Sequence, residues 1–346
     1  MNRAPYSPAK IGRRTNASHS RNRAATLAAM ALLTCSLATP VIANDLPETS
    51  VFSFGVIGHP FRTTSEELPL RTAIRQTDDD NLAFVVTNGI KSAQEPCSDK
   101  MYEQRKTLLN SAKNGLIVSL SGSDWIACKN ESGRSTSFER LNRIRELFFG
   151  DDFSFGESKI PLNRQSTSPK FHSYVENARW EVGNVMFATI NLPSRNNHYL
   201  AEGGRNSEFE DRLIANREWL QRIFVNASQE KADGIVLFCD GDPLSTQRRR
   251  IFDFNVKRDG FVEVRHTINL LASKFTGKVL LIHGAPPESP PAAPGILWKK
   301  NLGDLEVASS WVKITVDAHN PNFFVLDKKR IDQTTSEQQI AQLKTH

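Results

Sequence analysis

The stretch from Gly277 to Pro287, GKVLLIHGAPP, constrains the fold of this chain more than any other segment. An apolar run from Val279 to Ile282 leads into His283 and then into a Gly-Ala-Pro-Pro break. An uninterrupted run of this kind is typical of a strand covered on both faces in a layered α/β domain. The break places His283 at the carboxyl end of the strand, where open α/β sheets form their ligand crevices.

Four other apolar runs end in the same way. VFSFGVIG precedes His59, LAFVVT precedes Asn88-Gly89, GLIVSL precedes Ser121-Gly122, and GIVLF precedes Cys239-Asp240. We expect these strand ends to converge on one shallow crevice. The residues expected around it are His59, Asn88, Gly122, Asp240 and His283.

Helical spacing alternates with the strand runs. It predicts helices over residues 99–112, 136–149, 208–227 and 261–275. In the second of these, Thr136 followed by Glu139 predicts a capping box, and Phe138 falls on the apolar face. Gly183-Asn184 predicts a hairpin turn. Strands that alternate with helices but include hairpins indicate a mixed-sheet α/β sandwich, which we expect as one domain over residues 44–330, before a polar tail over 331–346.

The basic charge of the chain is concentrated at its start. The net charge is +6, and the first 43 residues hold six Lys and Arg residues and no acid. The remaining 38 basic residues equal the 38 acidic ones. The basic balance therefore gives no evidence for nucleic-acid binding.

This first segment resembles a secretory signal with a basic extension. Arg21 and Arg23 flank an apolar run over 24–37, and Val41-Ile42-Ala43 fits a cleavage site before Asn44. We expect a secreted, periplasmic protein with no membrane span after signal removal. A membrane anchor is the alternative, although the run is short for a span. Arg13-Arg14 is a weak twin-arginine signal, since it lies far from the apolar run.

Three cysteines follow this leader. Cys97 and Cys128 both come after predicted strand ends, and an oxidising compartment permits a disulfide between them if the two strands are neighbours. Cys239 follows a buried strand and is expected to be an inert packed thiol.

The chain resembles the calcineurin-like metallophosphoesterases, and most closely a secreted bacterial branch of that superfamily. The resemblance covers most of residues 51–326. It rests on FGVIGHP, FVVTNGIKSAQEPCSDKMYEQR, VSLSGSDWIAC, FERLNRIRELFFG, YVENARW, FATINLPSRNN, ANREWL and VLLIHGAPP. It implies a four-layer α-β-β-α sandwich of two mixed sheets, with two metals at the strand ends that hydrolyse phosphate esters. Trp125, Cys97, Cys128, Glu176, Asn177 and Trp219 match its scaffold positions.

The metal ligands of that family are mostly replaced here. The first strand has Gly58-His59 in place of Gly-Asp, and Asn88-Gly89 replaces the pair with the bridging Asp. Ser121-Gly122-Ser123 replaces Gly-Asp-Asn, and the final His-Gly-Asp-x-His motif retains only its first His. The degenerate positions are His59, Asn88, Gly89, Gly122, Ser123, His283, Ala285 and Pro287. Two dications cannot be held without bridging and terminal carboxylates, so we expect no catalytic residues and no cofactor.

Several alternatives remain open at this stage. His59, Asp240 and His283 form a candidate for a residual single divalent metal site, and Asp124 and Asp242 are further donors. Asn196-Asn197-His198 is a candidate rim contact, and Arg248-Arg249-Arg250 a candidate anion contact. Ser92, Ser121 and Ser123 lie near the predicted tips, but no Gly-x-Ser-x-Gly elbow is present.

Three functions follow from these observations. The first is an exported, non-catalytic protein that binds a protein or a small anion. The second is an active phosphoesterase with a rebuilt, mononuclear site. The third is a structural envelope protein without a ligand.

The leader itself is testable. Export of the full-length chain should give a mature species that begins near Asn44 and is neutral rather than basic. Amino-terminal sequencing and isoelectric focusing of the exported protein measure both properties. A soluble mature protein that keeps Met1 would contradict this prediction.

Overall fold

A computed structural model describes residues 51–61, 65–200, 206–245, 258–285, 295–308 and 311–327, all of which fall into one compact unit. The leader with its cleavage site, Arg248-Arg249-Arg250, Pro287 and the tail over 331–346 lie outside the described residues.

The first sheet has five strands and mixed pairing. In spatial order they are β12 (Phe324–Leu326), β11 (Trp311–Val316), β1 (Phe52–Ile57), β2 (Val85–Asn88) and β3 (Leu116–Ser119). β1, β2 and β3 are parallel, whereas β11 pairs antiparallel with both β1 and β12. The parallel strands bring their carboxyl ends to the same edge.

The second sheet has seven strands and is also mixed. In spatial order they are β4 (Asn163–Arg164), β5 (Ala178–Val182), β6 (Val185–Thr189), β7 (Gly234–Cys239), β8 (Lys278–Gly284), β10 (Leu302–Val307) and β9 (Leu297–Lys299). β6, β7, β8 and β10 are mutually parallel and form the centre of this sheet.

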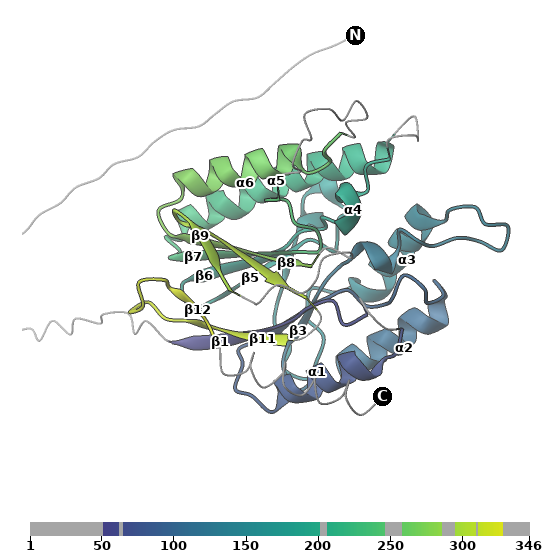
Figure 1. The fold of residues 1–346 in the computed structure, drawn as a ribbon, viewed down its shortest axis with the longest axis horizontal. Helices are drawn as coiled ribbons and strands as arrows, with labels where there is room; N and C mark the ends of the chain where they lie inside the picture. The colour runs from purple at the N-terminus through teal and green to yellow at the C-terminus, as the bar shows by residue number, and fades with distance from the viewer. Residues whose placement is uncertain are drawn as a thin grey trace, which may run out of the picture. The chain divides into compact units, whose positions relative to one another are not determined.

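Helices cover the outer face of each sheet (Figure 1). Leu70, Tyr102 and Leu141 pack from three helices against the first sheet. These helices are α1 (Leu68–Asp78), α2 (Asp99–Asn110) and α3 (Ser137–Phe148). Against the second sheet, Leu220 and Ile268 pack from α5 (Ser207–Gln229) and α6 (Val262–Lys274).

The two sheets face each other across an aromatic core. Phe84 stacks on Phe54 with ring centroids 5.2 Å apart and meets Phe187 edge-on at 4.8 Å. Trp180 and Phe238 stack at 5.9 Å in the same cluster. Such pairs contribute roughly 0.5–1.5 kcal/mol beyond the burial of their area. The layers are therefore helix, sheet, sheet and helix, as expected from the sequence.

Local details differ from the sequence predictions. Thr136 is the N-cap of α3, but its side chain accepts no capping hydrogen bond, because the residue has φ −119° and ψ 20° rather than an extended conformation. Phe138 on the predicted apolar face is 57% exposed. No helix or strand was predicted over residues 150–170, which contain β4 and the fully buried Gln165. Strand β9 was not predicted.

Cys97 and Cys128 form a disulfide, with their Cα atoms 5.8 Å apart, and Cys239 is buried and free. The pairing confirms the predicted bond, because β2 and β3 are neighbours and carry the two cysteines after their carboxyl ends.

No helix among the described residues is long and apolar enough to cross a membrane.

The disulfide closes a loop with a sequence separation of 31 residues. In the chain-entropy model a cross-link of this length stabilises a protein by roughly 3–4 kcal/mol. We expect Cys97→Ala/Cys128→Ala to lower the free energy of unfolding in urea by that amount. Dithiothreitol should destabilise the parent protein but not the double variant. Unfolding curves that do not change on reduction would contradict the prediction.

Candidate functional site

The carboxyl ends of strands from both sheets meet at one crevice with a volume of about 190 Å³. The predicted residues His59, Gly122, Ser123, Asp240 and Ala285 line it. Asn88 lies just beneath, and its Nδ2 is 3.5 Å from Asp240 Oδ1. The predicted convergence therefore places these positions together, with His283 as the exception described below.

His59 and two serines form a closed hydrogen-bonded cluster. His59 Nε2 lies 2.6 Å from Ser123 Oγ and 3.0 Å from Ser121 Oγ, and the two hydroxyls are 2.6 Å apart. Phe61 N donates to His59 Nδ1 (3.2 Å), so a neutral ring carries its proton on Nε2 and donates to the serines. Ser123 Oγ donates in turn to the carbonyl of Lys91 (2.8 Å). This polarity is opposite to that of a serine activated by a histidine base.

Gly89 stands where the family that the sequence resembles has its bridging carboxylate. Its φ is +79°, a conformation that residues with a Cβ rarely adopt. A Cβ here would lie 3.0 Å from Ser121 Oγ and 3.3 Å from His59 Nε2. Both the backbone and the packing therefore disfavour any carboxylate at this position.

Asp240 is the one acid among the described residues that line this crevice. It is 4% exposed, and its Oδ2 accepts hydrogen bonds from Gly122 N (2.8 Å) and Ser194 N (2.7 Å). Two backbone donors thus solvate the buried charge from within the protein. The two N–H groups stabilise the Asp240 carboxylate. No second carboxylate among the described lining residues is available for a dinuclear centre.

Asp124, a candidate metal donor, supports the site from below. It is fully buried and accepts from Ile90 N (2.9 Å), Lys91 N (3.2 Å) and Ser121 N (2.8 Å). Burial raises the pKa of Asp124 to about 7, against the opposing effects of these backbone donors and of Lys91. Its carboxylate completes a capping box on the short 3₁₀ helix Gly122–Asp124. Asp124 therefore holds the loop that carries Ser121 to Ser123.

His283 lies on the opposite face of the second sheet. Leu280 and Ile282 pack between the sheets, whereas Val279 and Leu281 pack against the helices. Because side chains alternate along a strand, His283 also points to the helix side. The sequence grouped His283 with His59 and Asp240, but its neighbours are different residues.

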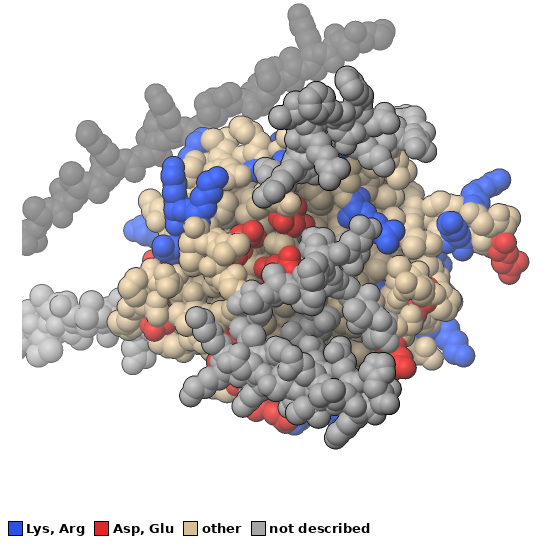
Figure 2. Space-filling model, in the orientation of Figure 1, with Lys and Arg blue, Asp and Glu red and all other residues tan. Residues whose placement is uncertain are grey.

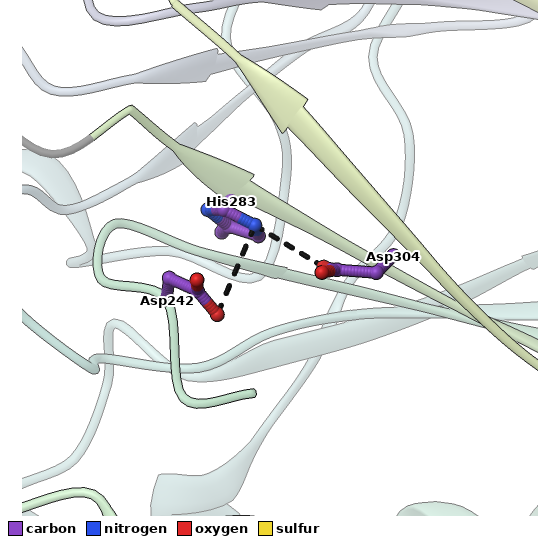
Figure 3. A group of neighbouring side chains, drawn as sticks. All are labelled: Asp242, His283 and Asp304. Carbon is purple, nitrogen blue, oxygen red and sulfur yellow. Dashed lines mark ion pairs between the residues drawn. The ribbon is translucent and has the colours of Figure 1, made fainter. Parts of the chain in front are cut away.

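The neighbours of His283 are two carboxylates (Figure 3). Its Nε2 lies 3.1 Å from Asp304 Oδ1 and 3.9 Å from Asp242 Oδ1. Burial lowers the pKa of His283, but the two carboxylates outweigh burial and the pKa lies above its usual value. Asp304 was not singled out from the sequence. It belongs to β10, and no sequence motif indicates that this strand pairs with β8.

A left-handed turn at residues 195–198 forms the rim of the crevice. Arg195, Asn196, Asn197 and His198 all have φ between 54° and 60°. Left-handed conformations cost residues with a Cβ roughly 1–2 kcal/mol each, so the surrounding contacts must impose this turn. Its first residue, Arg195, is exposed and lines both the crevice and a neighbouring one of about 170 Å³.

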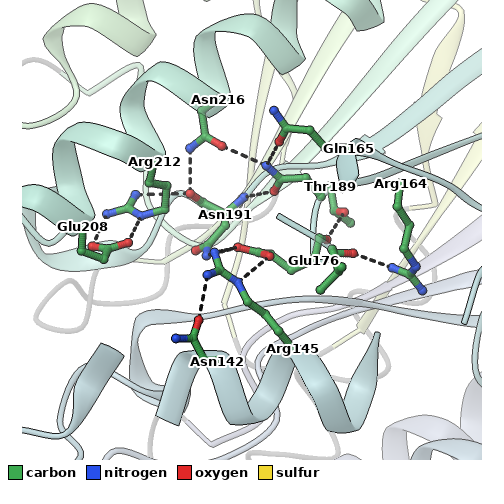
Figure 4. Close-up of polar contacts among 12 residues, drawn as sticks. Asn142, Arg145, Arg164, Gln165, Glu176, Thr189, Asn191, Glu208, Arg212 and Asn216 are labelled. Carbon is green, nitrogen blue, oxygen red and sulfur yellow. Dashed lines mark hydrogen bonds and ion pairs between the residues drawn. The ribbon is translucent and has the colours of Figure 1, made fainter. Parts of the chain in front are cut away.

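Arg212, which is fully buried and pairs with Glu208 (Figure 4), holds this turn. Its guanidinium donates to the Asn197 side chain (2.5 Å), to the Asn197 carbonyl (3.0 Å) and to Glu208 (2.6 Å). His198 Nδ1 lies 3.1 Å from Glu208 Oε2. Of the candidate rim contacts Asn196-Asn197-His198, Asn197 and His198 therefore have structural roles and Asn196 lines the neighbouring crevice, whereas Arg195 lines both.

Charge on the described part of the view in Figure 2 is mixed, with basic and acidic side chains side by side. This part of the surface has no continuous basic stripe of the kind that tracks a nucleic-acid backbone.

No family model and no curated protein matches the sequence. Among solved structures, the chain is similar to the protein TT1561 of Thermus thermophilus, with 7% identity, a TM-score of 0.43, and coverage of 80% of this chain and 99% of that one. It is also similar to a novel phosphatase of Mycoplasma pneumoniae, with 11% identity, a TM-score of 0.42, and coverage of 82% and 97%. Likeness at this level carries no argument about activity, so the chemistry of the site rests on its own side chains.

The charge of Glu208 should determine part of the acid stability. Burial raises the pKa of Glu208, but Arg212 and His198 outweigh it and lower the pKa to about 2 from its usual value of 4.5. The folded state therefore binds this proton more weakly than the unfolded state. Its contribution of about 3 kcal/mol is present above pH 4.5 and is lost as pH falls towards 2.

Urea unfolding of the parent protein and of Glu208→Gln at several pH values between about 2 and 6 measures this effect. The variant should be the less stable at the upper end of this range, and the difference between the two proteins should shrink as pH falls. A difference that does not depend on pH would contradict the assignment of the charge.

Proposed function

We propose that this protein is an exported binding protein built on a calcineurin-like phosphoesterase fold, and that its strand-end crevice binds a small anion without hydrolysing it. The observation that carries the proposal is Gly89. Its positive φ and the close approach of His59 and Ser121 disfavour the bridging carboxylate of the parent chemistry at this position.

The donors in the crevice also argue against a dinuclear centre. A pair of divalent cations requires several anionic oxygens to offset their mutual repulsion. Here Asp240 is already compensated by two backbone N–H groups. His59, Ser121 and Ser123 satisfy one another. The site has thus exchanged metal ligands for an internal hydrogen-bond network.

Arg195 supports an anionic ligand. Among the described residues, no carboxylate pairs with its guanidinium, which lies at the rim of both crevices. Arginine binds carboxylate and phosphate oxygens through two parallel hydrogen bonds. The turn that carries it is held by Arg212, so little conformational entropy is lost when a ligand binds.

The disulfide supports export. Disulfides persist in oxidising compartments such as the periplasm and are rare in the cytosol. The bond between Cys97 and Cys128 joins the loops after β2 and β3, next to the crevice. Together with the leader, it favours a mature protein that works outside the cytoplasm.

A mononuclear phosphoesterase is the second candidate function. One observation favours it, namely the group formed by Asp242, His283 and Asp304. This group lies on the helix side of the sheet rather than among the residues first considered, His59, Asp240 and His283. A structural envelope protein without a ligand is the third candidate, and it predicts no saturable binding at all.

Arg195→Gln tests the proposed function. Isothermal calorimetry with inorganic phosphate and with phenyl phosphate should show saturable binding to the parent protein. The variant should bind at least tenfold more weakly, because a charge-assisted hydrogen bond contributes roughly 1.5–3 kcal/mol. Arg217→Gln, which changes an exposed arginine on α5, is the matched control and should bind normally.

A hydrolysis assay completes the test. We expect no release of nitrophenol from bis(4-nitrophenyl) phosphate with Mn²⁺, Zn²⁺ or Mg²⁺. Metal-dependent hydrolysis by the parent protein would replace the binding function with the second candidate. Equal phosphate affinity in Arg195→Gln, or no binding at all, would equally overturn the proposed anion site.

A further inference from the structure

The helix-facing side of the second sheet carries a compact group of possible metal ligands. Asp242 follows β7, His283 lies near the end of β8, and Asp304 lies in β10. One ligand atom from each lies within 4.8 Å of the other two, and no other such group of three occurs among the described residues. We propose that Asp242, His283 and Asp304 bind a single zinc-like divalent cation.

The imidazole of His283 is oriented for coordination. Its Nδ1 lies 2.7 Å from the carbonyl oxygen of Gly284, which can only accept a hydrogen bond. Nδ1 therefore carries a proton, and Nε2 is the nitrogen directed at the two carboxylates. A backbone carbonyl that fixes the tautomer in this way is a common outer partner of metal-bound histidines.

His283 Nε2 lies between two carboxylates, those of Asp242 and Asp304. Asp304 Oδ1 is buried and has no partner that meets hydrogen-bond geometry, although Nε2 lies only 3.1 Å away. The His283 side chain is 2% exposed, whereas those of Asp242 and Asp304 are 18% and 27% exposed, so solvent meets the group on the side of the carboxylates. Two carboxylates and a nitrogen lone pair at this separation repel one another unless a positive charge lies between them.

The second carboxylate is held in place by the backbone. Asp242 Oδ1 accepts from Leu244 N (2.8 Å) and Ser245 N (2.9 Å). These bonds fix the loop after β7 and hold Asp242 Oδ1 at 3.9 Å from His283 Nε2. Ligands held in this way lose little entropy when they coordinate a cation.

The donor set favours zinc over the hard cations. Imidazole nitrogen is a good ligand for Zn²⁺, whereas Mg²⁺ and Ca²⁺ prefer six or more oxygens. One imidazole and two carboxylates supply three protein ligands, which leaves a fourth tetrahedral position for water. The Asp304 side chain is 27% exposed and provides the route by which solvent and the ion reach the site.

This site uses other side chains than the anion crevice, although Asp242 also lines the neighbouring crevice of about 170 Å³ beside Arg195. Asp240 points between the sheets and contacts Gly122 N, whereas the Asp242, His283 and Asp304 group lies on the other face. A cation there joins the ends of β7, β8 and β10 and stabilises the folded state by mass action. The proposal therefore holds whether or not the crevice binds phosphate.

Calorimetric titration of EDTA-treated, desalted protein with ZnCl₂ tests the site. We expect one equivalent to bind with micromolar or tighter affinity and to raise the midpoint of thermal unfolding. Asp304→Asn and His283→Gln should each weaken binding at least tenfold. His319→Gln is the matched control, because His319 lies 3.4 Å from a single carboxylate, Asp317, and is 77% exposed.

The outcomes separate the site from its alternatives. Should His283→Gln fail to fold, Asp304→Asn at the more exposed ligand still decides the question, provided that its unfolding midpoint in EDTA equals that of the parent. No zinc binding by the parent protein would mean that the positive charge is a proton on His283, and would overturn the proposal. Zinc bound equally by Asp304→Asn and the parent would overturn it too. Arg195→Gln should retain the full equivalent of zinc.

Discussion

The guanidinium of Arg212 is the contact on which the crevice most depends. A buried arginine is tolerated only where its charge and donors are satisfied, and Glu208 and Asn197 provide those partners at the start of α5. Satisfying Arg212 forces residues 195–198 into a left-handed turn that their side chains disfavour. That turn sets the position of Arg195. The electrostatic need of one buried charge thus places an exposed charge at the rim of the crevice.

The same buried network links the two halves of the sandwich. Arg145 from α3 forms two hydrogen bonds with Glu176, and Asn191 Nδ2 donates to the same carboxylate. The Asn191 carbonyl then accepts from both Asn216 and Arg212 on α5. Each polar atom in such a chain polarises the next, and losing one leaves its partners unsatisfied in a low dielectric. Helices α3 and α5, on opposite sides of the sandwich, are therefore coupled through Glu176 and Asn191. The sequence shows these residues but not the network that they form.

The sequence predicted the layers, because strands buried on both faces leave apolar runs and amphipathic helices leave a periodic pattern. It also predicted that His59, Asn88, Gly122 and Asp240 come together, since parallel strands end at one edge. It did not predict which face His283 occupies. The alternation of side chains along β8 decides that face, and a shift of one residue in the register of the strand would reverse it. The left-handed turn was equally hidden, since Asn and His tolerate this conformation without specifying it, and the contacts of Arg212 hold it.

The end of β8 explains why the two faces differ. A Cβ at Gly284 would lie 2.6 Å from Asn88 Nδ2 and 2.9 Å from the Asp240 carbonyl, so the inter-sheet side is closed to any larger residue. One residue earlier, His283 points to the helix side, where Asp304 lies beside it. The packing at Gly284 and the position of His283 therefore follow from the same alternation along β8: Gly284 faces Asn88 and Asp240 between the sheets, and His283 faces Asp304 on the helix side.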